Sequence, residues 1–533
     1  MDLGLNKEGI SYKYVWICLA VLIFLQTIYA AVFIERTSFV VEGQKYYCLF
    51  DDAMISMRYA DNWAHGRGLV WNVGEKVEGY TNPAWTIIMG LVHLLNLSPS
   101  HTCLAIQILG IIICWGCLFG TTVLAKNCYL TPAAAICALC LSATFYVLLY
   151  FSLFGMETGL LTFLVTMALA SAVKCINLSK ASSVPMLWFC GAFLVRMDVL
   201  PIAFFTAAII FLYAKQNRYQ VLIGTAVLVS TAAALFLARH SYYGHWFPNT
   251  YYLKATNWPI DKRILSGIKY ARWTFVMFIV PAVFAFAALS KFHKKHILLI
   301  SPMVILCTYQ TYVGGDAWPL NRLVIPAALA LFILTAEGIA IASDTIAQKI
   351  KNIPNNLLLI SFTIICVISI NITESDEILF KARPYSAWDN RHNIMITHAV
   401  GKISKPDNTI LVGYAGTVPY FTKYRCFDIL GKCDEYIART PVLPNKNRPG
   451  HNKYDLYYSI NTYKPDIMPH TMFHNPQDYI TSAYTPVIVT VDEADIPLMV
   501  KNNSCDLEYA ETVSWMKYEQ KFRYFEGISH SDF

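Results

Sequence analysis

The side chains of this sequence that are best suited to chemistry follow its first long apolar segment. Asp51 and Asp52 stand side by side at the beginning of a polar stretch. A carboxylate at such a position can accept the proton of an incoming hydroxyl group, which is the task of a general base. We take Asp51 and Asp52 as candidate catalytic residues. The same stretch holds four candidate substrate contacts: Arg58, Glu78, Tyr80 and Asn82.

Further charged and polar residues are scattered between the later apolar segments. Because an ionisable group within a membrane is costly, such residues usually line a cavity and pair with one another or with a substrate. Cationic side chains among them could stabilise a phosphate as it leaves. The candidate substrate-binding residues from these segments are Glu157, Arg196, Asp198, Asn249, Lys254, Asp316 and Arg322.

Each of these residues also has a simpler structural interpretation. One of Asp51 and Asp52 could cap the helix that follows, since Asp is favoured at that position. Asp316 comes after two glycines, as turn residues often do. Arg196, Lys254 and Arg322 could be interfacial cations whose charges reach the water, and Glu157 and Asp198 could do no more than neutralise nearby cations. Both interpretations stay open at the level of the sequence.

The sequence carries no signature of a nucleotide or metal site. It has neither a Gly-rich P-loop ending in Lys-Ser/Thr nor a Rossmann fingerprint, which disfavours an ATP-driven pump and a nucleotide-sugar enzyme. His65, His93 and His245 lack the spacing of metal ligands. A divalent cation is compatible with paired carboxylates, but cationic side chains can stabilise a single phosphodiester leaving group by themselves. We therefore predict that no cofactor is required.

The elements that must position these residues are mostly membrane helices. Of the 533 residues, 56% are hydrophobic and only 14% are charged, and the mean hydropathy is +0.42. So much apolar surface cannot be buried in a soluble core of ordinary composition, and a polytopic α-helical membrane protein is predicted. About eleven crossings are expected, and the long apolar segments are residues 14–34, 102–125, 132–151, 156–173, 198–214, 221–238, 273–290, 297–312, 323–342 and 355–370.

Two apolar segments are too short to cross a bilayer as single helices. Residues 84–97 are predicted to form a re-entrant or interfacial helix, and residues 184–195 are predicted to form one arm of a broken hairpin. The alternative, a spanning first segment and a merged second one, leaves Lys126, Lys174 and Lys180 outside, against the positive-inside rule. Both arrangements give a cytoplasmic N-terminus and an external C-terminal region.

The composition becomes polar after Ile370. We predict a transmembrane domain of residues 1–371, whose first external loop covers residues 35–101, and an extracytoplasmic α/β domain of residues 372–533. Short buried strands are expected at residues 409–413 and 485–491. Cys426 and Cys433 fall in the external domain, where oxidation is permitted, and the sequence leaves a disulfide between them open.

Several motifs, taken in order, resemble those of type C glycosyltransferases. They are Asp51-Asp52-Ala-Met-Ile-Ser-Met-Arg-Tyr-Ala, Val77-Glu-Gly-Tyr-Thr-Asn, Gly155-Met-Glu-Thr, Arg196-Met-Asp198, Tyr243-Gly244 with Pro248-Asn-Thr-Tyr-Tyr, Gly314-Gly-Asp316, and Asp428-Ile-Leu-Gly431 with Asp434 and Ile437-Ala-Arg439. The resemblance covers nearly the whole chain. It points to the terminal arabinofuranosyltransferases of the mycobacterial envelope and to related proteins that attach arabinofuranose to bacterial type IV pilins.

This resemblance implies the GT-C fold, a polyprenyl-phosphate sugar donor, and an external active site whose catalytic carboxylate belongs to Asp51 or Asp52. We therefore predict a membrane glycosyltransferase that moves a sugar, with D-arabinofuranose favoured, to a hydroxyl of a cell-envelope glycan or of a surface protein such as pilin. It would act at the outer, periplasmic face of the bacterial cytoplasmic (inner) membrane, without nucleic acid. The alternatives are a lipid-linked sugar transporter or flippase and a polyprenyl-phosphate-hexose (mannosyl-type) transferase of the same fold.

Overall fold

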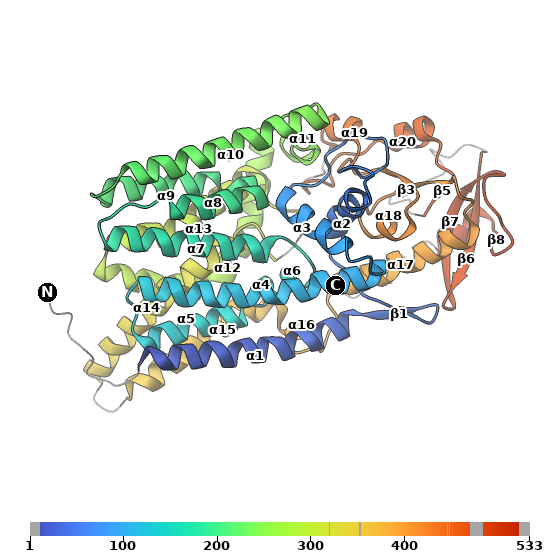
Figure 1. Cartoon of the computed structure of the whole chain (residues 1–533). Coiled ribbons are helices and arrows are strands. Elements are labelled where there is room, and N and C mark those ends of the chain that lie inside the picture. Colours follow the sequence, from blue (N-terminus) through green and yellow to red (C-terminus); the bar gives the residue numbers. More distant parts are fainter. Residues whose placement is uncertain are drawn as a thin grey trace.

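The chain folds into a bundle of long helices that is joined at one end to an α/β region, as the computed structural model shows (Figure 1). The structure describes residues 11–318, 320–350, 353–444, 446, 448–469 and 483–521. The long helices run side by side, and the sheet lies beyond one end of them. We call the end of the bundle next to the sheet the outer end and the opposite one the inner end.

Within the described residues, seven helices are long and apolar enough to cross a membrane. They are α1 (Tyr12–Thr37), α4 (Pro99–Asn127), α7 (Thr158–Asn177), α10 (Tyr219–Tyr243), α12 (Ile260–Ala288), α14 (Ile325–Lys349) and α15 (Asn355–Asn371). The count is eight when α5 (Pro132–Thr144) and α6 (Tyr146–Leu153), bent by 45°, are taken as one span. The predicted eleven crossings include three apolar helices that are shorter or more polar: α8 (Val184–Val195), α9 (Leu200–Tyr213) and α13 (Lys294–Tyr312). The predicted polytopic helical class is confirmed.

Burial separates the helices at the centre of the bundle from those at its surface. In α14, 78% of the most apolar window is buried, whereas α1, α10 and α15 bury only 22% of theirs. Exposed apolar side chains such as Phe24 and Leu25 on α1 suit contact with lipid rather than water. α14 therefore forms the core against which α5, α7 and α12 pack.

The predicted broken hairpin is present as α8 and α9. A short 3-10 turn, η1 (Met197–Val199), joins the two arms at their tip. At their base, the amide of Ala181 donates to the Gln216 carbonyl at 2.8 Å, and the amide of Gln216 donates to the Ser179 carbonyl at 2.9 Å. Since the two ends of the hairpin meet at one place, its tip carries Arg196 and Asp198 into the bundle.

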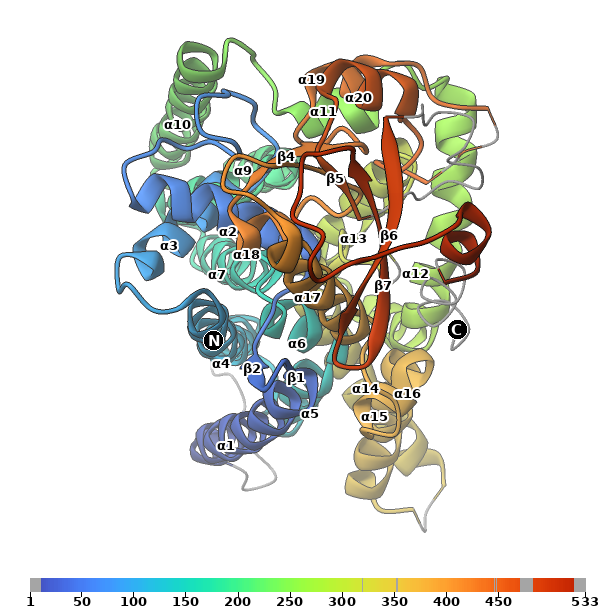
Figure 2. The ribbon, with the colours of Figure 1, turned by 90° about the vertical axis from the view of Figure 1, so that its right-hand side faces the viewer.

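Two short helices of the segment between α1 and α4 lie at the outer end, α2 (Asp51–Ala64) and α3 (Pro83–His93). Both ends of α3 contact outer groups, since Asn82 donates to Glu157 at 2.9 Å and His93 lies 3.0 Å from the Tyr420 hydroxyl. α3 therefore does not cross the bundle, as predicted for residues 84–97. Figure 2, a view onto the outer end, shows α2 beside α18 (Thr417–Thr422) of the α/β region.

The α/β region is built on a six-stranded mixed sheet with the order β4-β3-β5-β7-β6-β8. β4 (Arg425–Asp428) and β5 (Ile467–Met468) pair in parallel with β3 (Thr409–Val412). β7 (Ala494–Lys501), β6 (Tyr484–Val491) and β8 (Glu511–Thr512) continue it in antiparallel fashion. The strands predicted at 409–413 and 485–491 are confirmed as β3 and β6. The helices before and between the strands are α16 (Ser375–Ile378), α17 (Tyr385–Ile403), α19 (Glu435–Arg439) and α20 (Leu456–Tyr463).

Apolar side chains of the segment between α1 and α4 and of the α/β region share one core. Tyr59 and Trp71 of the former pack in the same cluster as Ile394, Val412 and Val487 of the latter. A small hairpin of β1 (Phe39–Val41) and β2 (Gln44–Tyr46) joins this cluster. The shared core holds the two parts in a defined arrangement, which decides what α2 faces.

The disulfide that the sequence left open is not formed in this structure. Cys426 and Cys433 are both free and buried. The thiol of Cys426 lies 3.7 Å from an Arg58 nitrogen, and that of Cys433 lies 3.9 Å from the Tyr59 hydroxyl. Each cysteine thus packs against a different residue of α2.

Candidate functional site

Asp52 lies in the first turn of α2, where its carboxylate meets two cations from distant parts of the chain. Arg322 Nη1 donates to Oδ2 at 3.0 Å, and Lys432 Nζ donates to Oδ1 at 2.9 Å. Arg322 belongs to the segment between α13 and α14, and Lys432 follows β4. Burial by itself would raise the pKa of Asp52, but the positive charges of Lys432, Arg322 and Lys254 outweigh burial and hold that pKa well below its usual range. Asp52 is therefore ionised.

Arg322 also contacts Asp316, so its guanidinium lies between two carboxylates. Nε and Nη2 of Arg322 donate to the two oxygens of Asp316 at 2.5 and 3.1 Å. Asp316 follows Gly314 and Gly315, whose φ angles of 90° and 91° other residues rarely adopt. A Cβ on Gly314 would also lie 2.7 Å from the Trp258 ring. The two glycines thus allow the close turn that places Asp316 against Arg322.

Lys254 comes to the same place from the short helix α11 (Asn249–Ala255). Its ammonium has no hydrogen bond or ion pair within the part of the chain that the structure describes. Burial lowers its pKa, and the nearby carboxylate of Asp316 opposes that change. We call Asp52, Asp316, Lys254, Arg322 and Lys432 the charged junction. With three cations and two carboxylates, it has a net positive charge.

Asp51 has a different environment from its neighbour. Its Oδ1 accepts bonds from the backbone amide of Thr417 at 2.9 Å and from the Thr417 hydroxyl at 3.4 Å. Burial raises the pKa of Asp51, and the charge of Lys432 partly counteracts that rise. Gly416 leaves no room for a side chain against the Asp51 backbone. Asp51 therefore joins α2 to the beginning of α18, while Asp52 faces the cations.

A second network lies beside the charged junction, at the tip of the broken hairpin. Arg196 Nη1 contacts Glu157 at 3.3 Å, and Nη2 contacts Asp198 at 2.5 Å. The other oxygen of Glu157 accepts the Asn82 amide. Glu157 also interacts electrostatically with Arg322 of the junction. The structure thus brings these four candidate residues together, near the junction but outside it.

Glu78 and Tyr80 belong to a third group. Arg239, near the end of α10, donates to Glu78 at 2.5 Å, and the two side chains are only 1% and 4% exposed. The Tyr80 hydroxyl lies 3.2 Å from that of Tyr243. These contacts join the loop after α2 to α10.

Arg58 and Asn249 hold the α/β region in place. Arg58 donates to the backbone carbonyls of Pro419 and Tyr424 at 2.5 and 2.7 Å. The amide of Asn249 donates to the carbonyls of Gly431, Lys432 and Asp434 at 3.0 to 3.2 Å. Asn249 therefore supports the backbone that carries Lys432.

The sequence did not single out Lys432, Arg239 or Thr417. Lys432 lies between Gly431 and Asp434, which belong to the last motif that resembles type C glycosyltransferases. This position was the only feature of the sequence that could have pointed to Lys432. Arg239 directly follows the span predicted at residues 221–238, where a charged residue is expected to belong to a loop. Thr417 had no signal, since its role depends on a contact 366 residues away.

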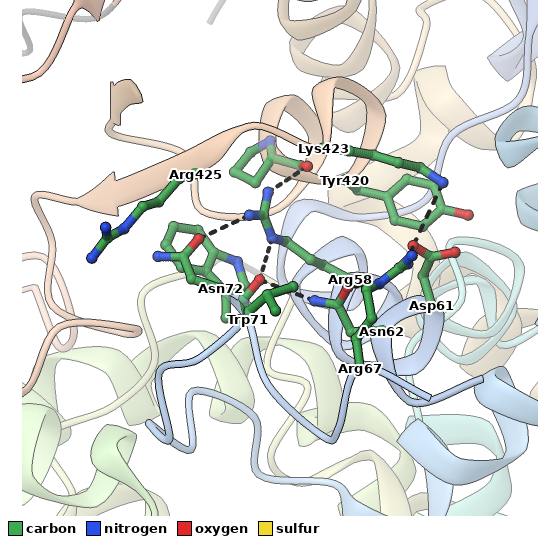
Figure 3. Close-up of a pocket in the computed structure, with 11 residues that line it drawn as sticks. Arg58, Asp61, Asn62, Arg67, Trp71, Asn72, Tyr420, Lys423 and Arg425 are labelled. Atoms are coloured by element: carbon green, nitrogen blue, oxygen red, sulfur yellow. Dashed lines mark hydrogen bonds and ion pairs between the residues drawn. The ribbon is translucent and has the colours of Figure 1, made fainter. Parts of the chain in front are cut away.

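A cavity of about 310 Å³ lies at the far end of α2 (Figure 3). Four cations line it, and each of them already has partners. Arg67 and Lys423 contact Asp61, Arg425 contacts Glu75, and Arg58 is bound by carbonyls. Among the described residues, this cavity therefore offers no cation without a partner, in contrast to Lys254 near Asp52.

The side chains that contact Asp52 are cationic. Within the described ranges, no three His, Cys, Asp or Glu side chains come together as metal ligands. The carboxylates of Asp51 and Asp52 bind different partners, Thr417 and the two cations. The positive charge beside Asp52 comes from Arg322, Lys432 and Lys254.

The comparison with known proteins rests on structure, because no protein-family model and no curated sequence matches the chain. ArnT from Cupriavidus metallidurans in the apo state is 11% identical, with a TM-score of 0.59 over 93% of this chain and 99% of ArnT. ArnT bound to undecaprenyl phosphate gives 0.55 at 11% identity, over 92% and 98%. The apo oligosaccharyltransferase of Archaeoglobus fulgidus gives 0.50 at 11% identity, over 78% and 64%. ArnT and the oligosaccharyltransferase are glycosyltransferases of the GT-C fold, and this chain, a polytopic membrane protein with a C-terminal sheet region, has that fold.

Proposed function

We propose that this protein is a glycosyltransferase that takes its sugar from a polyprenyl phosphate, with Asp52 as the catalytic base. The charged junction carries this proposal, because it combines an ionised carboxylate with surplus cations where α2, α11 and the α/β region meet. A carboxylate can accept the proton of an acceptor hydroxyl, and cations can stabilise a departing phosphate. ArnT bound to undecaprenyl phosphate supports a lipid phosphate as the ligand of a protein with this fold.

In the proposed reaction, the acceptor oxygen attacks the anomeric carbon of the sugar while the bond from that carbon to the phosphate oxygen breaks. The acceptor proton passes to Asp52, and polyprenyl phosphate leaves with the electron pair of the broken bond. Lys254 is the cation with room for a new partner, because it has no ion pair within the described residues. The net positive charge of the junction compensates the charge that develops on the phosphate.

Donor binding would also change the base strength of Asp52. In the unliganded site, Lys432 and Arg322 stabilise the ionised form of Asp52 and so make it a weak base. A phosphate that binds these cations draws their positive charge toward itself, which raises the pKa of Asp52. Asp52 thus becomes an effective base when the donor is in place, and Asp51 positions α2 against α18.

D-arabinofuranose is the sugar that we favour, and a cell-envelope glycan or a pilin-like surface protein is the favoured acceptor. The motif resemblance over nearly the whole chain supports both choices. The reaction would take place at the outer face of the cytoplasmic membrane, with the outer end of the bundle and the α/β region outside. In this proposal, Arg196, Glu157 and Asp198, which lie beside the junction, would contact the sugar.

The test supplies the purified protein with radiolabelled polyprenyl-phosphate-arabinose and an envelope or pilin acceptor. Asp52→Asn keeps the shape of the side chain but removes the base, so transfer should fall by about 10²- to 10⁴-fold. Asp376→Asn is the control, because Asp376 is 71% exposed on α16 and lies outside the junction. Transfer by Asp52→Asn at the wild-type rate would refute the proposal.

The same variants separate the two alternatives. A flippase in proteoliposomes would move labelled lipid between leaflets without transferring its sugar, and Asp52→Asn would then affect translocation alone. A hexosyltransferase would use polyprenyl-phosphate-mannose in place of the arabinose donor, with the same dependence on Asp52.

A further inference from the structure

The inner end of the helix bundle contains a second cavity, which the proposed transfer reaction does not use. It has a volume of about 830 Å³ and lies among the ends of α4 and α7, the beginnings of α8 and α10, and Trp16 of α1. Figure 1 shows these helix ends on the side opposite to the sheet. We propose that this cavity binds the phosphate headgroup of an anionic phospholipid.

The charges around the cavity favour an anion. Lys126, Lys174 and Lys180 all line it, and its lining residues within the described chain include no Asp or Glu. None of the three lysines forms an ion pair in the part of the chain that the structure covers. Three unneutralised ammonium groups around one hollow repel one another, and an anion between them removes that repulsion.

The base of the broken hairpin contributes part of the cavity lining. Lys180 pairs with Gln216 in an isolated β-bridge, and the amide of Ala181 donates to the Gln216 carbonyl at 2.8 Å. α8 begins beside this bridge, and its first residues, Val184 and Pro185, line the cavity.

The exposed apolar side chains that line the cavity favour a lipid over a soluble phosphate as the anion. Trp16, Leu178 and Val184 line the cavity and are 42%, 57% and 45% exposed. A soluble anion would leave these apolar surfaces uncovered, whereas the acyl chains of a lipid would pack against them. Tryptophan and lysine at the end of membrane helices are typical of the headgroup level, and basic pockets between such helices bind anionic headgroups.

The test titrates phosphatidylglycerol with a fluorescent acyl chain into the full-length protein in neutral detergent. A lysine near an anionic lipid contributes about a fivefold gain in binding. The variant K126Q/K174Q/K180Q should therefore bind about 100-fold more weakly than the wild type. The matched control K215Q/K291Q/K349Q removes three exposed lysines from the same end outside the cavity, and it should change binding less than threefold. Labelled phosphatidylcholine should bind weakly to all three proteins.

Three results would overturn the proposal. They are an equal loss in the control variant, equal affinity for phosphatidylcholine, and competition by soluble glycerol phosphate as effective as that by unlabelled phosphatidylglycerol. The last result would indicate a site for a soluble anion. If the triple variant does not fold, Lys174→Gln alone should weaken binding about fivefold. A second measurement needs no variant: wild-type binding of phosphatidylglycerol should weaken as NaCl is raised from about 50 to about 500 mM, because salt screens exposed charges.

Discussion

The sharpest prediction concerns Lys432, the cation that the α/β region contributes to the junction. Lys432 Nζ lies 2.9 Å from Asp52, and the two side chains are 10% and 19% exposed. In Lys432→Gln, Arg322 still pairs with Asp52, so the folding free energy should fall by only about 1–2 kcal/mol, near the lower limit for a charged hydrogen bond. The loss of one cation at the phosphate should lower kcat by about 10²- to 10³-fold, or about 2.7–4 kcal/mol in the barrier.

The assay measures kcat and KM for the polyprenyl-phosphate donor at saturating acceptor, together with the Tm of each protein in detergent. Lys423→Gln is the matched control, because Lys423 lies in the same region, is 52% exposed and is 3.5 Å from Asp61. It should leave kcat unchanged, and an exposed pair of this kind contributes about 0–1 kcal/mol to stability. If Lys432→Gln kept kcat within about threefold of the wild type, the role of the junction in binding the leaving phosphate would be refuted.

The pH dependence of stability adds an independent test of the same ion pair. Because the folded pKa of Asp52 lies below its unfolded value, its charge stabilises the fold fully above about pH 4. That contribution is lost as the pH falls through the folded pKa. Lys432→Gln moves this pKa upward, so the stability difference between wild type and variant should be greatest at neutral pH and shrink in acid. A difference that increased as the pH fell would contradict the pairing.

Three further substitutions test the structural roles of residues around the junction. Asp51→Asn should change the unfolding free energy by less than about 1 kcal/mol, because its amide oxygen can still accept the Thr417 amide; a larger loss in chemical denaturation would show that the charge itself is needed. Gly314→Ala should cost about 1–3 kcal/mol and reduce transfer, since its φ is 90° and its Cβ would lie 2.7 Å from a tryptophan ring; an unchanged Tm would contradict this. Arg239→Met should lower the unfolding free energy by about 3–5 kcal/mol, because it leaves the buried Glu78 unpaired. Adding Glu78→Gln should recover part of the lost Tm, and no recovery would show that Arg239 acts through packing and not through its charge.

The membrane class and the course of the helices could be predicted from the sequence because they depend on local properties. Apolar content adds up along a segment, and a segment's length decides whether it reaches across a bilayer. Residues 184–195 and 84–97 were too short to cross, and the structure shows a broken hairpin and an outer helix at these places. The two strands were predictable for the same reason, since β3 and β6 are short apolar runs between turns.

The site was only half predictable. The polar motifs of the sequence include Asp52, Asp316, Lys254 and Arg322. Lys432, the partner of Asp52 in the α/β region, is 380 residues away in the chain and was missed. Adjacent carboxylates look alike in a sequence, and the structure separates them because α18 takes the first and the cations take the second. Electrostatic interaction depends on distance in space and on burial, neither of which is a property of neighbouring residues. The sequence by itself therefore determined which side chains are available. Only the packing of α2 against the segment between α13 and α14 and against the α/β region decided which of them meet.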